Sequence, residues 1–227
     1  MTSAEFPPRS QLSEQVAHYV RSRIFDGSYP AGSFVRLDQL AADLGISVTP
    51  VREALVGLRA EGLLDQQPHR GFVVLPLTDR DISDVSAVQA HIGGELAARA
   101  ADGIDEDRLD ELHRVQAQLE QAYRRGDDPA AVRLNHEFHR LINVAAGSPK
   151  LAQLMSQITR YAPESVFPLV AGWPTTSKHH HRQILAALGR RDREGARTAM
   201  AEHLAAGAEP MIAHLRAHGV LHPGAGG

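Results

Sequence analysis

Histidines are the side chains in this sequence most able to do chemistry. The chain has 13 of them and no cysteine, so a transition-metal site would need imidazole and oxygen ligands rather than thiolates. His139, His181 and His203 each border an apolar stripe with helical spacing. Asn135 precedes His139 by four residues, which places both on one helix face. Three imidazoles and one oxygen would suit a divalent transition metal that keeps open positions for water.

The same histidines have a simpler interpretation. A histidine beside an apolar stripe is often a hydrogen-bonded core or boundary residue. The sequence does not show whether the three helices bring their imidazoles together. Either His179 or His180 could also replace His181 as a ligand, because the three are consecutive.

A second group of polar side chains lies at the start of a predicted helix. A short apolar helix over residues 37–44 ends at Gly45, and Ser47, Thr49 and Arg52 follow a tight turn. This order is typical of a helix-turn-helix, whose second helix enters the DNA major groove by its N-terminal end. Hydroxyl and guanidinium groups there suit phosphate oxygens and base edges. The alternative is an ordinary helix start, with a capping residue followed by Pro50.

The next residues favour the helix-turn-helix. A polar turn over residues 65–71 leads into the β-rich run 72–75, which Pro76 closes. We therefore expect a two-stranded hairpin, and hence a winged helix. At its tip, Gly71 would let the backbone approach DNA closely, and Arg70 would bring a cation to phosphates or the minor groove.

The charge of the chain requires any DNA-binding surface to be local. The net charge is −3, and residues 9–77 contain seven arginines and seven acidic residues. Such a balance requires a basic face rather than a basic domain. Arg36, Arg52, Arg59 and Arg70 could form it. Arg59 could equally be a solvated helix residue paired with nearby acids, and Arg36 has the same ambiguity.

These patterns together resemble the GntR family of bacterial transcription regulators. The resemblance rests on residues in the family's order and spacing: Leu40-Ala41, Leu44-Gly45, Ser47, Thr49-Pro50-Val51-Arg52-Glu53-Ala54-Leu55, Leu58, Glu61-Gly62 and Arg70-Gly71. Val48 stands where the family commonly has an arginine. That departure removes a base or phosphate contact and so bears on the preferred DNA sequence.

The C-terminal half resembles the FCD ligand-binding domain of the FadR branch of this family. The matching residues are Asn135, Phe138-His139, His181-Arg182, Ile184-Leu185, Ala196-Arg197, Ala199-Met200 and His203-Leu204. The resemblance implies that Asn135, His139, His181 and His203 bind a metal, with zinc, nickel or manganese as the candidates. Many relatives have aspartate at the position of Asn135. The neutral amide of Asn135 is a weaker oxygen donor to a metal than a carboxylate.

The resemblance also implies a pocket for a small-molecule effector. Many relatives carry an Arg-x-x-Leu-Glu pattern in the first helix of this domain, and here Gln89 replaces the arginine. Gln89 cannot pair ionically with a carboxylate effector, so the effector could be less acidic than in those relatives. We expect Gln89 and His91 to contact it.

Two sets of elements must position these residues. The predicted fold is mainly α, with an N-terminal winged helix-turn-helix carrying a small β-hairpin wing and a C-terminal all-α helical bundle. We expect a disordered tail over 1–8, a DNA-binding domain over 9–77, an effector-binding and dimerisation domain over 78–220, and a flexible tail over 221–227. Glycine and proline breaks predict bundle helices over 79–101, 105–125, 129–146, 149–170, 176–189 and 193–217.

The expected function is that of a cytoplasmic transcription regulator without enzymatic activity. No apolar run is long enough for a membrane span, and no secretory signal is visible. A homodimer would bind a pseudo-palindromic double-stranded DNA operator as a repressor. A small-molecule effector, with a carboxylate-bearing metabolite as a candidate, would bind beside the metal and change operator affinity.

Two other functions remain open. The metal itself could be the signal. Alternatively, the protein could be a metalloenzyme whose metal activates water. The enzyme would need a general base beside the metal, and Glu137 lies on a different helix face from Asn135 and His139.

Overall fold

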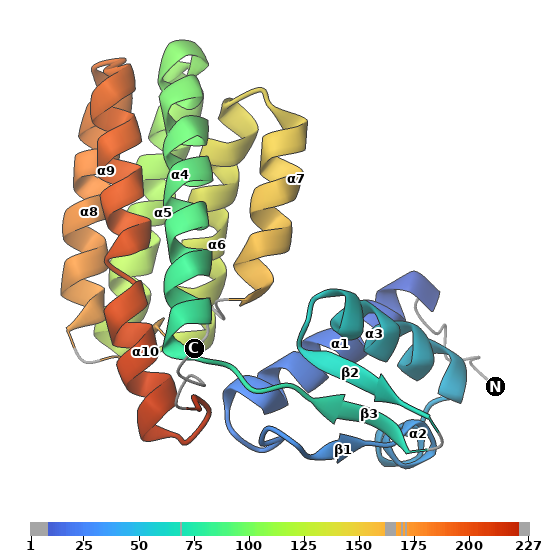
Figure 1. Ribbon diagram of the computed structural model, residues 1–227. Helices are drawn as coiled ribbons and strands as arrows, with labels where there is room; N and C mark the ends of the chain where they lie inside the picture. Colours follow the sequence, from blue (N-terminus) through green and yellow to red (C-terminus); the bar gives the residue numbers. More distant parts are fainter. Residues whose placement is uncertain (1–8, 69, 162–166, 169, 171, 223–227) are drawn as a thin grey trace. The chain divides into compact units, whose positions relative to one another are not determined.

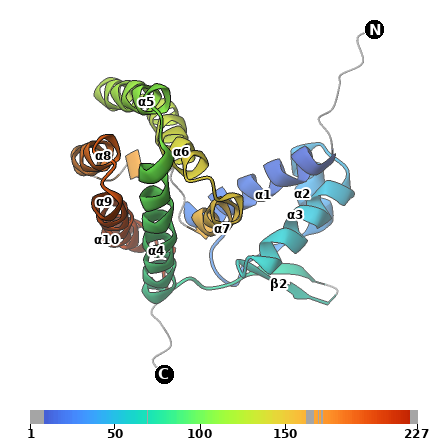
Figure 2. The same ribbon diagram turned by 90° about the horizontal axis from the view of Figure 1, so that it is seen from above.

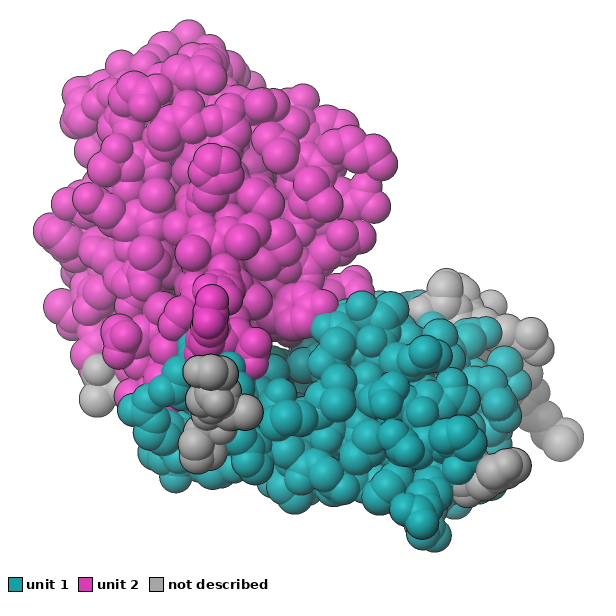
Figure 3. Space-filling model, in the orientation of Figure 1, with its two compact units in different colours: residues 1–79, 215–227 teal, residues 80–214 magenta. Residues whose placement is uncertain are grey.

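The computed structural model describes residues 9–68, 70–161, 167–168, 170 and 172–222. The chain forms two compact units (Figure 3): residues 1–79 with 215–227, and residues 80–214. The sequence-based division into 9–77 and 78–220 differs from this at its C-terminal end, because residues from 215 onward group with the N-terminal unit. The expected tail over 1–8 and residues 223–227 lie outside the described residues.

The N-terminal unit begins with three helices. Helix α1 covers Arg9–Phe25, α2 covers Leu37–Leu44 and α3 covers Val48–Ala60. Gly45 ends α2 with φ 66°, the left-handed conformation that glycine adopts without steric cost. Helix α1 packs against α3. Their shared core consists of fully buried aliphatic side chains, among them Val20, Ile24, Val51, Leu55 and Leu58.

A small antiparallel sheet completes this unit. Strands β1 (Phe34–Val35), β2 (Leu64–Gln67) and β3 (Gly71–Val74) lie in the order β1-β3-β2. The expected hairpin is present as β2 and β3, and β1 adds a third strand that the sequence did not predict. A two-residue strand is too short to show the alternating pattern that identifies strands in a sequence.

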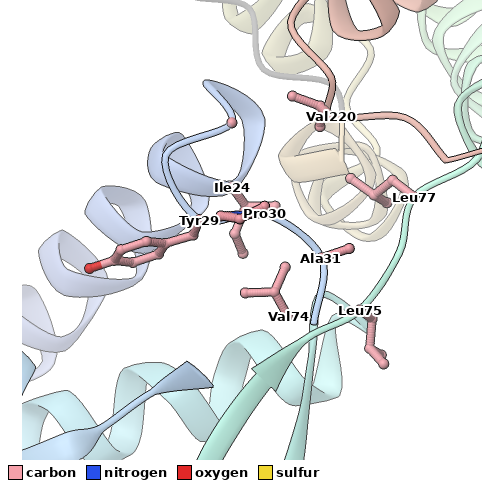
Figure 4. A pocket seen from close by; sticks show the side chains of 9 residues that line it. Ile24, Tyr29, Pro30, Ala31, Val74, Leu75, Leu77 and Val220 are labelled. Atoms are coloured by element: carbon pink, nitrogen blue, oxygen red, sulfur yellow. The ribbon is translucent and has the colours of Figure 1, made fainter. Parts of the chain in front are cut away.

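The segment after residue 215 closes one edge of the same unit. The backbone N–H of His222 donates to the carbonyl of Leu77 at 2.8 Å, within a parallel bridge between Leu77 and Leu221. Arg216 pairs with Asp79. Val220 is 7% exposed and lines a small pocket with Leu77 and Ile24 (Figure 4).

The second unit is a helical bundle (Figure 1). Its helices are α4 (Asp79–Gly103), α5 (Glu106–Arg125), α6 (Asp128–Ala145), α7 (Pro149–Ile158), α8 (Trp173–Gly189) and α9 (Arg193–Ala205); α10 (Ala208–Ala217) leads out of it. Helix α5 packs against α6 and α8, and α8 packs against α9. Figure 2 shows these helices end-on, with α8 and α9 on one side and α6 and α7 on the other.

Aspartate caps explain where several of these helices begin. The side chains of Asp105, Asp127 and Asp192 each accept a hydrogen bond from a backbone N–H in the first turn. A single apolar core, including Phe138, Ile142, Ile184 and Leu188, joins the helices that follow these caps. The site residues therefore stand on well-anchored helices.

Three of the predicted helical spans were wrong. The fourth ends at Ile158 and is followed by a 3₁₀ turn over Thr159–Tyr161; residues 162–166 and 169 of the predicted span lie outside the described residues. The fifth begins at Trp173, because Pro174 fits the first turn of a helix. The sixth is two helices that divide near Gly207, where an added Cβ would lie 3.0 Å from Phe167. None of the helices in the described ranges has the length and apolar character needed to cross a membrane.

Candidate metal centre and nucleic-acid interface

Three histidine rings from three helices meet inside the bundle. Nε2 of His203 on α9 lies 3.3 Å from Nε2 of His181 on α8 and 3.2 Å from Nε2 of His139 on α6. His181 and His203 are buried, and His139 is half-buried. Phe138 stacks on His181 with ring centroids 4.1 Å apart, which fixes the plane of that imidazole. The structure thus brings together three of the four residues expected to bind a metal.

Two of the three separations between these nitrogens fit a shared divalent ion, and the three ligand atoms all lie within 4.8 Å of one another. Ligand nitrogens about 2.1 Å from one ion, at angles of 90–109°, lie roughly 3.0–3.4 Å apart. The two measured separations, 3.2 and 3.3 Å, fall within this range. Imidazole ligands suit zinc, nickel and related ions. Of His179, His180 and His181, only His181 belongs to this group of converging nitrogens.

Burial keeps the imidazoles in the neutral form that binds metals. Burial, followed by the nearby His203 and His139, holds the pKa of His181 well below its usual value. Burial, followed by His139 and His180, does the same to the pKa of His203. Removing charged rings from water costs free energy, so both rings are neutral near pH 7. A neutral imidazole offers a lone pair to a metal without first losing a proton.

A glutamine lies behind the site. Oε1 of Gln116, on α5, is 2.7 Å from Nδ1 of His181, and the glutamine is 4% exposed. Sequence reasoning did not identify Gln116. The available signal was a polar residue within the apolar stripe of α5, between Leu112, Val115 and Leu119.

Asn135 and Glu137 lie on α6 with His139. Asn135 is half-buried and one turn before His139, and its role as the oxygen ligand stays a prediction. Glu137 accepts two hydrogen bonds from Arg140, at 2.6 and 2.7 Å. That pairing lowers the pKa of Glu137 and makes it a weaker base. This pairing makes Glu137 less suited to act as the base that a metalloenzyme would need.

The two expected effector-contacting residues occupy different faces of α4. Gln89 is buried, and its amide donates to the carbonyl of Ile158 at 3.4 Å. His91 is exposed, so the structure does not bring the two together. Gly93, also on α4, faces α9 closely: an added Cβ would lie 2.3 Å from Leu204. Their contacts with an effector stay predictions.

Some buried polar atoms near the site have no hydrogen-bond partner among the described residues. They are Oγ of Ser177, Nδ1 of His180 and Nδ1 of His203. Ser177 is fully buried one turn before His181, and the rings of His180 and His203 are 5.7 Å apart. Buried polar atoms ordinarily have a partner. These atoms are therefore available to a bound polar molecule.

The helix-turn-helix leaves its polar residues accessible. Ser47, Thr49 and Arg52 are all exposed at the N-terminal end of α3. Ser47 occupies the N-cap position, but its side chain makes no capping hydrogen bond. Its hydroxyl is thus not used in holding the helix start. Arg36 is exposed at the N-cap of α2.

The remaining predicted contacts lie at or near the wing. Arg59 on α3 approaches Asp65 at 4.0 Å and Gln66 at 3.4 Å, which supports its interpretation as a paired surface residue. Arg70 is exposed next to Gly71. Gly71 has φ 100°, and an added Cβ would lie 2.8 Å from the carbonyl oxygen of Val35. The glycine is therefore required by the sheet itself, whether or not DNA approaches it.

Comparison with known families agrees with this two-part architecture. Residues 12–74 match the gntR family of bacterial regulatory proteins. Residues 84–206, more than half of the chain, match the FCD domain. The chain belongs to the GntR family. This family member is a DNA-binding transcriptional regulator with a C-terminal FCD domain.

Relatives of this GntR-family protein share both units. The HTH-type transcriptional regulator McbR of Escherichia coli K12 is 28% identical over 84% of this chain and 88% of its own. A probable D-xylose utilization operon transcriptional repressor of Paenarthrobacter nicotinovorans is also 28% identical, over 87% of this chain and 88% of its own. The solved structure of E. coli McbR/YncC matches with a TM-score of 0.69 and 27% identity, covering 91% of this chain and 97% of that chain.

Proposed function

We propose that this regulator is a metabolite-responsive repressor whose FCD domain senses its effector at a protein-bound divalent metal. The observation that carries the proposal is the convergence of three Nε2 atoms, with 3.2 and 3.3 Å separations. His139, His181 and His203 would hold the ion, with Asn135 as an oxygen ligand. When bound, the ion supplies open coordination positions that attract an electron-rich group of the effector.

The protein's own side chains define what surrounds such an effector. The unpartnered atoms of Ser177 and His180 can form hydrogen bonds with it. Trp173 is buried, and its ring lies 5.9 Å from that of His203. A small polar molecule with at least one metal-binding oxygen or nitrogen fits this chemistry better than an apolar one.

On the DNA side, we propose that a homodimer presents two copies of α3 to a pseudo-palindromic operator. Ser47, Thr49 and Arg52 would enter the major groove, and Arg36 and Arg70 would contact the backbone. The effector would bind one conformational state of the dimer more tightly than the other and so change operator affinity. By linkage, operator binding would change effector affinity by the same factor. A relative described as a probable repressor of a sugar-utilization operon supports the sign of regulation.

Metal content tests the proposal directly. Protein dialysed against zinc, nickel or manganese, and then freed of excess ion, should retain about one ion per chain. His203→Ala should lose the ion and melt at a lower temperature than the wild type in the presence of metal. His179→Ala is the matched control, because His179 is an exposed histidine two residues from His181. Wild-type protein that retains none of these metals would refute the metal centre.

Operator binding distinguishes an effector from a metal signal. If the metal is only a cofactor, metal-loaded protein should bind operator DNA tightly, and adding the cognate metabolite should release it. If the metal is itself the signal, adding or removing the ion alone should produce the full change in operator affinity. Titration of labelled operator with apo and metal-loaded protein at fixed salt separates the two outcomes.

A further inference from the structure

The side chains behind the three-histidine site form a chain of hydrogen bonds that runs outward to a cluster of charges. Gln116 contacts Nδ1 of His181 through Oε1 at 2.7 Å. Its other amide atom, Nε2, donates to Oε1 of Glu120 at 3.3 Å. Both Gln116 and Glu120 lie on α5, one turn apart. The glutamine thus stands between a buried imidazole and a carboxylate.

Glu120 is held as an anion at the outer end of this chain. Its carboxylate pairs with Lys178 at 2.9 Å and Arg182 at 3.3 Å, both on α8, and with Arg124 at 3.9 Å. The glutamate side chain is 14% exposed, so its ion pairs are partly shielded from water and less weakened by solvent than exposed ones. Three cations around one carboxylate keep it ionised near neutral pH.

An ionised carboxylate accepts hydrogen bonds and donates none. It therefore requires the NH₂ end of the Gln116 amide, because the amide oxygen would meet it with like partial charge. With NH₂ turned towards Glu120, the amide oxygen faces His181. An oxygen at 2.7 Å from Nδ1 requires a proton on Nδ1. The proton of a neutral imidazole is then on Nδ1, and Nε2 carries the lone pair.

We propose that Gln116 and Glu120 are positioning residues that select the Nδ1–H tautomer of His181, and so hold its Nε2 ready for a metal ion. The charge of Glu120 sets the orientation of one amide, and that amide sets the tautomer of one ring. The functional role of this tautomer, which is to present Nε2 to a metal ion, rests on the proposed metal centre. The tautomer itself is a property of the metal-free protein.

The opposite arrangement would disable the site. If the Gln116 amide were reversed, its NH₂ group would donate to a bare Nδ1, and the His181 proton would move to Nε2. That proton would point at Nε2 of His203, only 3.3 Å away, and would occupy the position of the ion. An outer partner that fixes the ring in its metal-binding tautomer also raises the basicity of the ligand nitrogen.

Glu120, at the outer end of the hydrogen-bonded series, borders solvent and can be substituted without changing the buried histidines. A groove between α5 and α8 is lined by Gln116, Glu120 and Arg182, together with His113 and Leu185. Glu120→Gln keeps the size of the side chain and removes its charge, so either end of the Gln116 amide can face it. Gln116→Met removes both the acceptor and the donor in a side chain of similar length. Glu111→Gln is the matched control: the same change on the same helix, at a glutamate paired with Arg114.

Nitrogen-15 NMR of chelator-treated protein reads the tautomer without any metal. The wild type and Glu111→Gln should show His181 protonated at Nδ1, whereas Glu120→Gln should show a mixture of tautomers. Gln116→Met should no longer favour Nδ1–H. Zinc affinity, measured by competition with a chromophoric chelator, should fall about 10- to 100-fold in Gln116→Met and by less in Glu120→Gln. Circular dichroism spectra matching the wild type establish that each variant is folded.

The outcomes separate this inference from the proposed function. Wild-type His181 protonated at Nε2 would overturn the inference. An unchanged tautomer and unchanged zinc affinity in Glu120→Gln would overturn the part assigned to the carboxylate. Nδ1–H in the wild type and its loss in the variants would support the inference even if no metal were retained, in which case only the metal centre would fail.

Discussion

Arg52 is the single residue on which sequence-specific operator binding is expected to depend most. It is exposed in the first turns of α3, next to the exposed Ser47 and Thr49. We expect Arg52→Ala to weaken operator binding by about 1–3 kcal/mol if its guanidinium reads a base edge. Fluorescence anisotropy with labelled operator, at one salt concentration, measures the loss. Arg59→Ala serves as a control, because Arg59 already pairs with residues of β2. Equal effects of the two changes would argue against base reading by Arg52.

The buried histidines predict how stability depends on pH in the metal-free protein. Burial lowers the pKa of His181 and of His203 well below the usual value. Below about pH 6.5 the unfolded chain takes up protons on these residues that the folded chain does not, so acidification favours unfolding. Above that pH both states are neutral, and these residues contribute no pH dependence.

Chemical denaturation of chelator-treated protein at pH 7.5 and 5.5 measures this effect. His203→Gln should lose less stability between the two pH values than the wild type, because one group that resists protonation has been removed. His179→Gln should behave like the wild type, because His179 is exposed. If His203→Gln and the wild type have the same dependence, His203 does not resist protonation in the folded state.

The sequence identified the candidate metal ligands more readily than the side chains that contact them. His139, His181 and His203 could be selected because each lies beside an apolar stripe. Gln116 could not, because a polar residue within a stripe shows nothing of the ring it will contact from another helix. His91, which its place in the sequence predicts to contact the effector, is exposed, and that contact stays a prediction.

At the scale of elements, one buried ion pair ties α1 to the end of α3. Arg21 donates from Nε at 3.2 Å and from Nη2 at 2.9 Å to the carboxylate of Glu61, the residue that ends α3. Their side chains are 9% and 15% exposed. Removing one member of a buried pair leaves the other charge without compensation, at a cost of several kcal/mol.

We therefore expect Glu61→Ala to destabilise the N-terminal unit by about 3 kcal/mol. Replacing both residues by Arg21→Met and Glu61→Leu should cost less than Glu61→Ala alone, since no unpaired charge remains. Urea denaturation of the three proteins gives the comparison. A double variant less stable than Glu61→Ala would show that the ion pair contributes specific stability beyond compensating two buried charges.

Elements with long periodic patterns were predictable, and short or interrupted ones were not. Helices α5 and α6 follow their predicted spans closely, because their aspartate caps and apolar stripes are local signals. Strand β1 has only two residues and depends on pairing with β3, more than 30 residues later. At the break between α9 and α10, Gly207 lies close to Phe167, which comes from another part of the chain. Contacts of this kind leave no periodic trace in the sequence.

At the scale of the whole molecule, the two units differ in how the chain builds them. The second unit is formed by one continuous stretch, residues 80–214. The N-terminal unit combines residues 1–79, which precede that stretch, with residues 215–227, which follow it. Gly27 contacts the later segment: with φ 78°, it leaves 3.0 Å between a hypothetical Cβ and the carbonyl oxygen of His218. Gly32 has a similar φ of 82° but no neighbouring atom within 4 Å of such a Cβ.

This pair of glycines isolates the contribution of the C-terminal segment. Gly27→Ala and Gly32→Ala should each cost about 1 kcal/mol for a left-handed alanine, and Gly27→Ala should cost about 1 kcal/mol more, because it presses on residue 218. Hydrogen–deuterium exchange over residues 71–77 reports the difference in the N-terminal unit itself. Equal exchange rates in the two variants would show that the C-terminal segment moves away from residue 27 without destabilising the N-terminal unit.

The Leu77–Leu221 bridge also bears on how the protein is made. Residues 220–222 leave the ribosome only after all of residues 80–214 have been translated. When the helix-turn-helix has been synthesised, the nascent chain still lacks Val220, which lines a pocket with Ile24, and the hydrogen bond from the N–H of His222 to the Leu77 carbonyl. Domains commonly fold in order as they emerge, but this one cannot finish first. Its C-terminal segment joins it only after residues 80–214 have been synthesised, so a translation product that stops before residue 220 lacks the Leu77–Leu221 bridge.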